Sequence, residues 1–398
     1  MTSSYSTDIV IFGGGIAGLW LLNRLRQDGY STILFETDRL GSGQTLASQG
    51  IIHGGLKYAL SGSLTGASNV IADMPARWRR CLAGEGDIDL RSCRVLSEHY
   101  YMWSDSGVRS KLKTFLGSKS LVGRVAAVAK QDYPEFFNGA KSPGMLYQLP
   151  DFVVDTESLL DALAGTHRDH IFSVRPGSYS FQRNDEGQIA QVTLEVDSGE
   201  TVIAAQRFVF CAGSGNQQLI DAAKLTRPKT QLRPLHMIYA KGDSLPPAFL
   251  HCIGDSFSLT PKLTVTSHSD ATGKTVWYLG GELAEAGVGR TEDAQIAAAR
   301  TLLEELFPWI DLSDVEFHSF AIDRAEPKVD SHFRPDDAYF VAEDNTLVAW
   351  PTKLTLSPRL ADKISEHLTL AGLVATASTD ADPGQVLQAA QIANSRWD

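Results

Sequence analysis

Residues 8–36 read DIVIFGGGIAGLWLLNRLRQDGYSTILFE, and this stretch decides the fold. Ile9–Phe12 form a continuous apolar run, which is typical of a strand buried on both faces of a parallel sheet. Glycines then follow with the GxGxxG spacing, leucines recur at helical intervals, and a second apolar run ends at Glu36. This order predicts a βαβ unit that binds a dinucleotide.

Each element of this unit has a physical purpose. Gly13 permits the tight turn after the strand, Gly15 lets the backbone approach a pyrophosphate, and Gly18 lets the helix pack closely on the strand. The N-terminus of the helix offers N–H groups and a partial positive charge to the phosphates. Glu36 is placed to accept hydrogen bonds from an adenosine ribose.

The bulk composition limits the class of protein. A chain of 398 residues predicts two joined domains, and its formal net charge of −11 weighs against a nucleic-acid binder. The four cysteines show neither a CxxC pair nor metal-ligand spacing, so we expect reduced thiols and no metal site. No apolar run is long enough to cross a bilayer. We expect a cytoplasmic protein, with contact to the inner face of a membrane left open.

Later segments predict how the domains are arranged. RFVFCAGSG, residues 207–215, reads as another strand and glycine turn of the nucleotide-binding sheet, whereas residues 231–283 favour an antiparallel sheet. Helix caps are predicted at Asp155 or Thr156, at Thr291 and at Ser357. We therefore expect an α/β fold in which a Rossmann-like domain is interleaved with a mainly antiparallel α+β substrate domain. The predicted ranges are 1–80, 150–225 and 325–398 for the first domain, and 81–149 and 226–324 for the second.

Four segments together resemble the superfamily of FAD-dependent oxidoreductases that includes D-amino-acid oxidase and glycerol-3-phosphate dehydrogenase. They are GGGIAG with Glu36, RFVFCAGSG, FAIDRAEPKVD at 320–330 and PTKLTLSPRLADKI at 351–364. Ile52–Tyr58, IHGGLKY, is most similar to FAD-dependent glycerol-3-phosphate dehydrogenase. L-2-hydroxyglutarate dehydrogenase is a second relative, through Gly62–Leu64. Pro351 and Thr352 stand where the first relative has two glycines.

The resemblance implies FAD as the cofactor and assigns residues to it. The expected FAD-binding residues are Gly13, Gly15, Ile16, Ala17, Gly18, Glu36, Thr37, Thr45, Ser48, Gly50, Val174, Ala212, Gly213, Thr352, Lys353, Leu354 and Thr355. The expected catalytic residues are His53, Lys57, Tyr58, His236, Arg324 and Lys353. A structural role for His53 and solvent-facing positions for Lys57 and Tyr58 stay open.

The implied activity is transfer of a hydride from the CH–OH carbon of a small anionic substrate, a hydroxy acid or phosphorylated alcohol, to flavin N5. Oxidation of the CH–NH bond of an amino acid or amine is the alternative on the same scaffold. Two further alternatives are a nicotinamide dehydrogenase and a flavoprotein acting on RNA or a protein partner. The last would use the acid-free basic stretch at 109–130. The sequence leaves the electron acceptor open between oxygen, a quinone and a protein.

Overall fold

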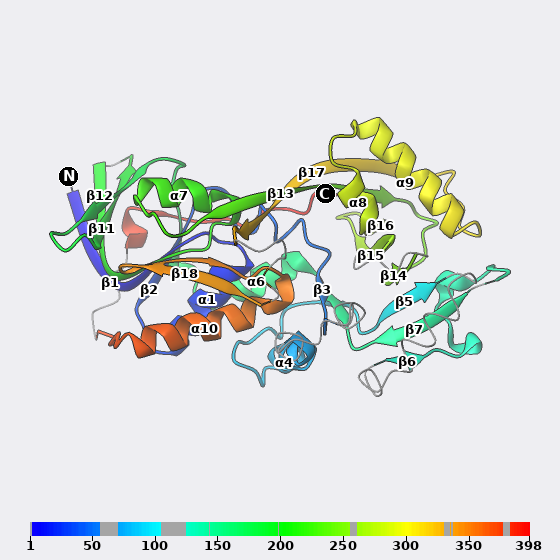
Figure 1. Ribbon diagram of the computed structural model, residues 1–398, viewed down its shortest axis with the longest axis horizontal. Coiled ribbons are helices and arrows are strands. Elements are labelled where there is room, and N and C mark those ends of the chain that lie inside the picture. Colours follow the sequence, from blue (N-terminus) through cyan, green and yellow to red (C-terminus); the bar gives the residue numbers. More distant parts are fainter. Residues whose placement is uncertain are drawn as a thin grey trace.

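The computed structural model describes residues 2–55, 71–104, 125–142, 144–197, 199–254, 261–329, 335, 337–376 and 383–398. Figure 1 shows two regions side by side, each built on a large sheet. The helices are α1 (Ile16–Gln27), α4 (Met74–Leu82), α6 (Thr156–Gly165), α7 (Asn216–Ala222), α8 (Glu282–Ala286), α9 (Glu292–Leu306) and α10 (Ser357–Leu370).

The first sheet has nine strands in the described residues, and its centre is parallel. The parallel strands, in spatial order, are β19 (Thr346–Trp350), β12 (Gly199–Phe210), β1 (Thr2–Phe12), β2 (Thr32–Glu36) and β9 (Ile171–Ser173). Antiparallel strands extend it: β10 (Tyr179–Arg183), β11 (Ile189–Val196), β18 (Tyr339–Glu343) and β20 (Gln388–Ala389). The carboxyl ends of parallel strands meet at one edge, so segments far apart in sequence are brought together there.

Successive side chains of β1 pack in two different cores, because neighbouring side chains of a strand point to opposite faces of the sheet. Ile9 and Ile11 pack in the core beneath α1, α6 and α10, whereas Val10 and Phe12 pack in the core on the opposite face. That opposite core contains side chains of β11 and α7. Both faces of the central strands are therefore covered, which confirms the α/β, Rossmann-like fold expected from residues 8–36.

The second sheet has eight strands and is antiparallel apart from one parallel pair. Its spatial order is β17 (Glu316–Pro327), β13 (Thr230–Lys241), β16 (Thr275–Gly280), β15 (Leu263–Ser269), β14 (Leu250–Cys252), β5 (Tyr100–Ser104), β7 (Met145–Leu149) and β6 (Ala126–Ala127). Helix α9 packs on it through Ala299 and Leu303. The antiparallel sheet expected over 231–283 is confirmed. The limits of the two domains stay a prediction.

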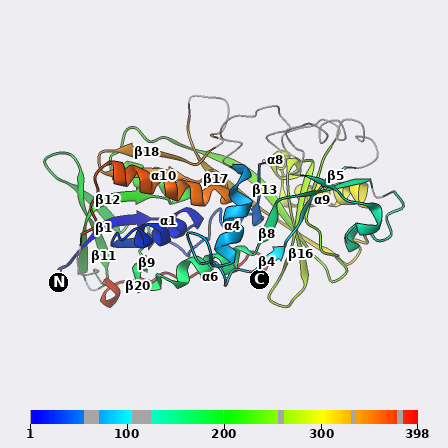
Figure 2. The ribbon, with the colours of Figure 1, turned by 90° about the horizontal axis from the view of Figure 1, so that it is seen from below.

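A small third sheet lies between the two regions. Its order is β3 (Ile51–Ile52), β8 (Phe152–Val154) and β4 (Val95–Ser97), and Figure 2 shows α4 beside it at the middle of the molecule. Gly50 has a φ of +68°, and a Cβ there would lie 2.1 Å from the Val154 carbonyl oxygen. Glycine is therefore required where the chain enters β3.

The caps and cysteines agree with sequence reasoning at most positions. The side chains of Asp155 and Thr291 accept hydrogen bonds from the backbone N–H groups of Ser158 and Ala294, respectively. The cap predicted at Ser357 is wrong: Ser357 lies inside α10, and its hydroxyl donates to the Leu354 carbonyl instead. All four cysteines are buried and form no disulfide. None of the described helices is long and apolar enough to cross a membrane.

The C-terminal residues join the two regions. After β20 the backbone runs beside Leu40, and Trp397 then packs in a core with Tyr278 of the second sheet. The His268 ring lies 4.7 Å from the Trp397 ring, its Nε2 lies 3.0 Å from the Thr266 hydroxyl, and the side chain is 4% exposed. Burial lowers the pKa of His268 to about 4.

This buried histidine predicts acid sensitivity of the folded state. Between pH 6.5 and 4 the unfolded chain binds a proton at His268 while the folded chain does not, so the unfolding free energy falls as the pH falls. A shift from 6.5 to about 4 corresponds to a loss on the order of 3 kcal/mol by pH 4. Thermal unfolding measured from pH 7.5 to 4 should show a shallower decline for His268→Gln than for wild type.

His99→Gln is the matched control because His99 is exposed, and its ring contacts the side chain of Gln148 at 2.9 Å. Its melting curve should follow wild type across the pH range. A decline in His268→Gln as steep as in wild type would show that other groups cause the acid sensitivity.

Candidate active site

A groove of about 760 Å³ runs along the carboxyl edge of the parallel strands. It is bordered by the turns after β1, β2, β12 and β19. The predicted FAD-binding residues that line it are Gly13, Gly15, Ile16, Ala17, Glu36, Thr37, Thr45, Ser48, Ala212, Gly213, Thr352, Lys353 and Leu354. A groove of this size at this edge suits an extended cofactor.

The turn between β1 and α1 has the form that a diphosphate site needs. Gly13 has a φ of +110°, and a Cβ there would lie 2.6 Å from the backbone of Ala212. At Gly15, by contrast, a Cβ would meet only the Thr45 hydroxyl, at 3.2 Å. The first turn of α1 contains no acidic residue, and Gly15 provides no side-chain cap. The positive end of the helix thus faces the groove without a competing carboxylate in that turn.

Glu36 is fixed at the end of β2. Its carboxylate accepts hydrogen bonds from the backbone N–H groups of Gly14 (2.6 Å), Thr37 (2.7 Å) and Asp38 (3.0 Å). These three donors fix the position of the Glu36 carboxylate at the border of the groove. An acid held there is placed to bind ribose hydroxyls.

Gly18, Gly50, Val174 and Thr355, also predicted to bind the cofactor, do not line the groove in the described residues. A Cβ at Gly18 would lie 1.9 Å from the Gly13 carbonyl oxygen, so this glycine serves the packing of α1 on β1. The Val174 N–H donates to the Glu36 carbonyl. The hydroxyl of Thr355 donates to the His53 carbonyl oxygen at 3.2 Å. Contact of these four residues with the cofactor stays a prediction.

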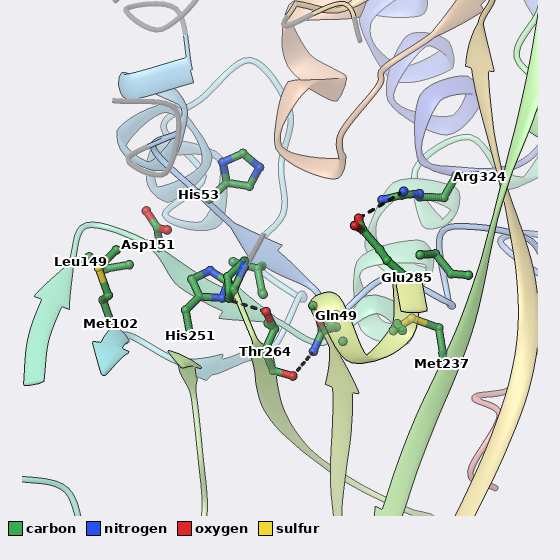
Figure 3. A pocket seen from close by; sticks show the side chains of 16 residues that line it. Gln49, His53, Met102, Leu149, Asp151, Met237, His251, Thr264, Glu285 and Arg324 are labelled. Atoms are coloured by element: carbon green, nitrogen blue, oxygen red, sulfur yellow. Dashed lines mark hydrogen bonds and ion pairs between the residues drawn. The ribbon is translucent and has the colours of Figure 1, made fainter. Parts of the chain in front are cut away.

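A second cavity, of about 200 Å³, adjoins the groove. Gln49, Leu235, Met237 and Arg324 line both spaces, so the two communicate at these side chains. Figure 3 shows Arg324 and Glu285 pointing toward each other at one side, with a separation of 3.7 Å between Nη2 and Oε1. The rest of the wall is largely apolar, with Ile51, Met102, Leu149 and Pro261 among its residues.

His53 lies on the other side of this cavity (Figure 3), and its backbone is held from two directions. Its carbonyl accepts from Thr355, and the N–H of the next residue, Gly54, donates to Asp151 at 2.8 Å. The Asp151 carboxylate is buried and also lines the cavity. The segment at residues 51–54 and the segment after β19 therefore meet at the site, although about 300 residues separate them.

The other predicted catalytic residues have different positions. Lys353 lines the groove, and His236 lines neither cavity in the described residues. Both ring nitrogens of His236 are engaged, one with the Gly287 carbonyl (3.1 Å) and the other with the Ser319 hydroxyl (2.9 Å). Lys57, Tyr58, Gly62–Leu64 and most of the basic stretch at 109–130 lie outside the described residues. Their roles stay predictions.

Five polar residues of the cavity were missed by sequence reasoning: Gln49, Asp151, His251, Thr264 and Glu285. Asp151 directly precedes the short strand β8, and His251 lies in the short strand β14. Glu285 lies in the short helix α8. No spacing in the sequence links them to one another. Only Gln49 had a local signal, because it lies between the predicted residues Ser48 and Gly50.

Known proteins are similar to this chain in sequence and in architecture. The family model described as FAD dependent oxidoreductase (DAO) matches residues 8–352. The probable FAD-dependent oxidoreductase PA4991 of Pseudomonas aeruginosa is 45% identical over 374 residues, covering 94% of this chain and 93% of that protein. Its crystal structure superposes with a TM-score of 0.84 at 39% identity, over 100% of this chain and 99% of that one.

Two more distant structures share the fold. Glycine oxidase from Geobacillus kaustophilus has a TM-score of 0.66 at 14% identity, over 94% of this chain and 100% of its own. L-α-glycerophosphate oxidase from Mycoplasma pneumoniae, solved with FAD bound, has a TM-score of 0.62 at 11% identity, over 92% and 95%. From the family match, and from the close relative that spans nearly the whole length, the chain belongs to the DAO family of FAD-dependent oxidoreductases.

Proposed function

We propose that this FAD-dependent enzyme oxidises the CH–OH carbon of a small anionic substrate, a hydroxy acid or a phosphorylated alcohol. Bound FAD supplies the two-electron acceptor, with N5 of the flavin receiving the hydride. The observation that carries the proposal is the position of Arg324, which lines both the cofactor groove and the adjoining cavity. A guanidinium there holds an anionic group of the substrate next to the cofactor.

The groove residues form two groups, one for each end of the cofactor that they would bind. The Gly13–Ala17 turn would hold the diphosphate, and Glu36 the adenosine ribose. At the other end, Lys353 lies just before the 3₁₀ turn Leu354–Leu356 and α10. Lys353 and the N-terminus of α10 would offset negative charge at that end of the groove.

Oxidation of an alcohol also needs a group that takes the hydroxyl proton. His53 lines the cavity, and its backbone is fixed by Thr355 and, through Gly54, by Asp151. His251 lines the same cavity, and a neutral imidazole of either residue accepts such a proton near neutral pH. Because His236 lies outside both cavities in the described residues, the proposal assigns it no contact with the substrate.

Oxidation of a CH–NH bond is the second candidate function. The charged side chains that line the cavity support it. The described lining contains two carboxylates, Asp151 and Glu285, beside the single guanidinium of Arg324. In an amino acid substrate, the ammonium group would pair with Glu285 and the carboxylate would pair with Arg324. A purely anionic substrate must instead compete with Glu285 for the guanidinium.

A panel of substrates separates these two functions. The protein is made anaerobic and mixed with hydroxy acids (glycolate, lactate), glycerol 3-phosphate and amino acids (glycine, alanine, proline). We expect hydroxy acids or glycerol 3-phosphate to cause a rapid loss of the visible flavin absorption after mixing. Bleaching by the amino acids alone would assign the CH–NH reaction instead.

Arg324→Ala should raise the KM for the bleaching substrate by about 10- to 100-fold, because a charge-assisted hydrogen bond contributes roughly 1.5–3 kcal/mol. FAD content should stay at the wild-type level. Arg233→Ala is the matched control: Arg233 pairs with Arg324 in the β13–β17 register but lines neither cavity in the described residues. Equal KM values for Arg324→Ala and Arg233→Ala would remove Arg324 from the substrate site.

Thr352 has backbone strain at the edge of the groove. Its φ of +62° is in the left-handed region, which is costly for a β-branched residue, and its hydroxyl donates to the Asp337 carbonyl at 3.3 Å. It precedes Lys353, and both line the groove. The strained backbone therefore sets the direction in which the chain leaves β19 toward Lys353.

Thr352→Gly should weaken FAD retention several-fold, because glycine relieves the strain but frees the segment before Lys353. The unfolding free energy of the FAD-free protein should change by less than about 1 kcal/mol, since relief of strain offsets the added chain entropy. Lys224→Gly is the control, with a φ of +53° away from the groove. FAD release during dialysis against potassium bromide measures retention, and equal release from both variants would contradict the assignment.

A further inference from the structure

His251 occupies the cavity in a fixed orientation. It lies in β14, and Figure 3 shows its side chain near the middle of the cavity wall. Its Nδ1 lies 3.0 Å from the hydroxyl of Thr264, the residue directly opposite it in the antiparallel β14–β15 pair. The ring also meets the Tyr100 ring edge-on, with 4.7 Å between centroids. These contacts set both the position and the tilt of the imidazole.

Both partners of His251 are themselves held. Tyr100 is fully buried, and its hydroxyl donates to the Val265 carbonyl at 3.1 Å. Thr264 is 4% exposed, and its carbonyl accepts from the Gln49 side-chain amide at 3.3 Å. Gln49 lines both the cavity and the cofactor groove. The imidazole is therefore fixed relative to the edge of the groove and not only within its own sheet.

The charged groups that share the cavity suit an imidazole that gains a proton. Asp151, His53, Glu285 and Arg324 line it with His251, and Figure 3 shows Asp151 on the same side as the two histidines. The Asp151 carboxylate is 3% exposed. A buried carboxylate on that side stabilises an imidazolium, whereas Arg324 and Glu285 offset one another across the cavity.

We propose that His251 is the catalytic base that removes the hydroxyl proton of the substrate; this rests on the proposed CH–OH oxidation. The O–H bond breaks and its proton passes to Nε2, while Nδ1 stays bonded to Thr264. The substrate carbon loses a hydride with its electron pair to the flavin, and a C=O bond forms. The substrate is oxidised by two electrons, and both hydrogens are accounted for. His53 then serves the binding of the substrate rather than the proton transfer.

His251→Asn tests the assignment in the FAD-loaded protein. Asparagine places an amide near the position of Nδ1, so the contact with Thr264 is retained, but it has no basic nitrogen. The rate constant of anaerobic flavin reduction should fall by about 10²- to 10⁴-fold, the usual contribution of a positioned base. FAD content and the unfolding temperature should match wild type. The decline of the rate toward low pH in wild type should be absent from the variant.

His251→Ala adds a measurement that a structural role would not affect. Exogenous imidazole should restore part of the lost rate in this variant, with saturation as its concentration rises. Thr264→Val should lower the rate about tenfold without any response to imidazole, because the base is present but less well held. His99→Gln, at an exposed position away from the cavity, should leave the rate unchanged.

The outcomes separate the two proposals. If no hydroxy acid or phosphorylated alcohol reduces the flavin of the wild type, the proposed function fails and the base with it. If the wild type is reduced and His251→Asn reacts at the same rate with the same pH profile, only the assignment of His251 is overturned. Slow reduction in His251→Ala without rescue by imidazole would also overturn it, because His251 would then only position other groups.

Discussion

Two glycines allow close backbone approaches around the end of β1, and the rest of the site depends on them. A Cβ at Gly13 would lie 2.6 Å from Ala212, and a Cβ at Gly18 would lie 1.9 Å from the Gly13 carbonyl. Any side chain at these positions would push β1 away from the turn after β12 or from α1. Because β1 is the central strand, that shift would move the edges from which Glu36, Lys353 and Ala212 border the groove. The shape of the cofactor groove therefore depends on the absence of a Cβ atom at Gly13 and at Gly18.

Two hydrogen bonds then attach the adjoining cavity to this groove. The Thr355 hydroxyl holds the His53 carbonyl, and the Gln49 amide donates to the Tyr278 carbonyl of the second sheet at 2.8 Å. The first joins the segment after β19 to the segment before α4, and the second joins the groove to the antiparallel sheet. A cavity built from both sheets keeps a constant distance to the cofactor only if such cross-links exist. This explains why side chains as remote in sequence as His53, His251 and Arg324 line one space.

Sequence reasoning succeeded where the signal was local and failed where register decided the outcome. The strand, turn and helix at residues 8–36, the caps at Asp155 and Thr291, and the antiparallel sheet after residue 230 each follow from short patterns. Ser357 was misassigned because the preceding 3₁₀ turn moves the start of α10 back by one residue. His251 and Thr264 have no motif: they meet because β14 and β15 pair in one register. Asp151 and Glu285 likewise reach the cavity through the packing of short elements. The sequence could therefore predict the residues of the cofactor groove much better than those of the cavity beside it.

The cavity beside the groove is lined by charged groups of both signs. Of the cationic residues expected to be catalytic, only Arg324 lines this cavity in the described residues, and the carboxylates of Asp151 and Glu285 line it too. Arg324 borders the groove as well, so in the proposed function its guanidinium serves both a substrate anion and the electron-rich end of the cofactor. In that proposal a bound anion shares the Arg324 guanidinium with Glu285, whose Oε1 lies 3.7 Å from Nη2. Binding of the substrate and the electrostatic environment of the flavin are then coupled through a single side chain. In the same proposal His251 is oriented by the uncharged side chains of Thr264 and Tyr100, so the direction of its ring does not depend on the position of Arg324.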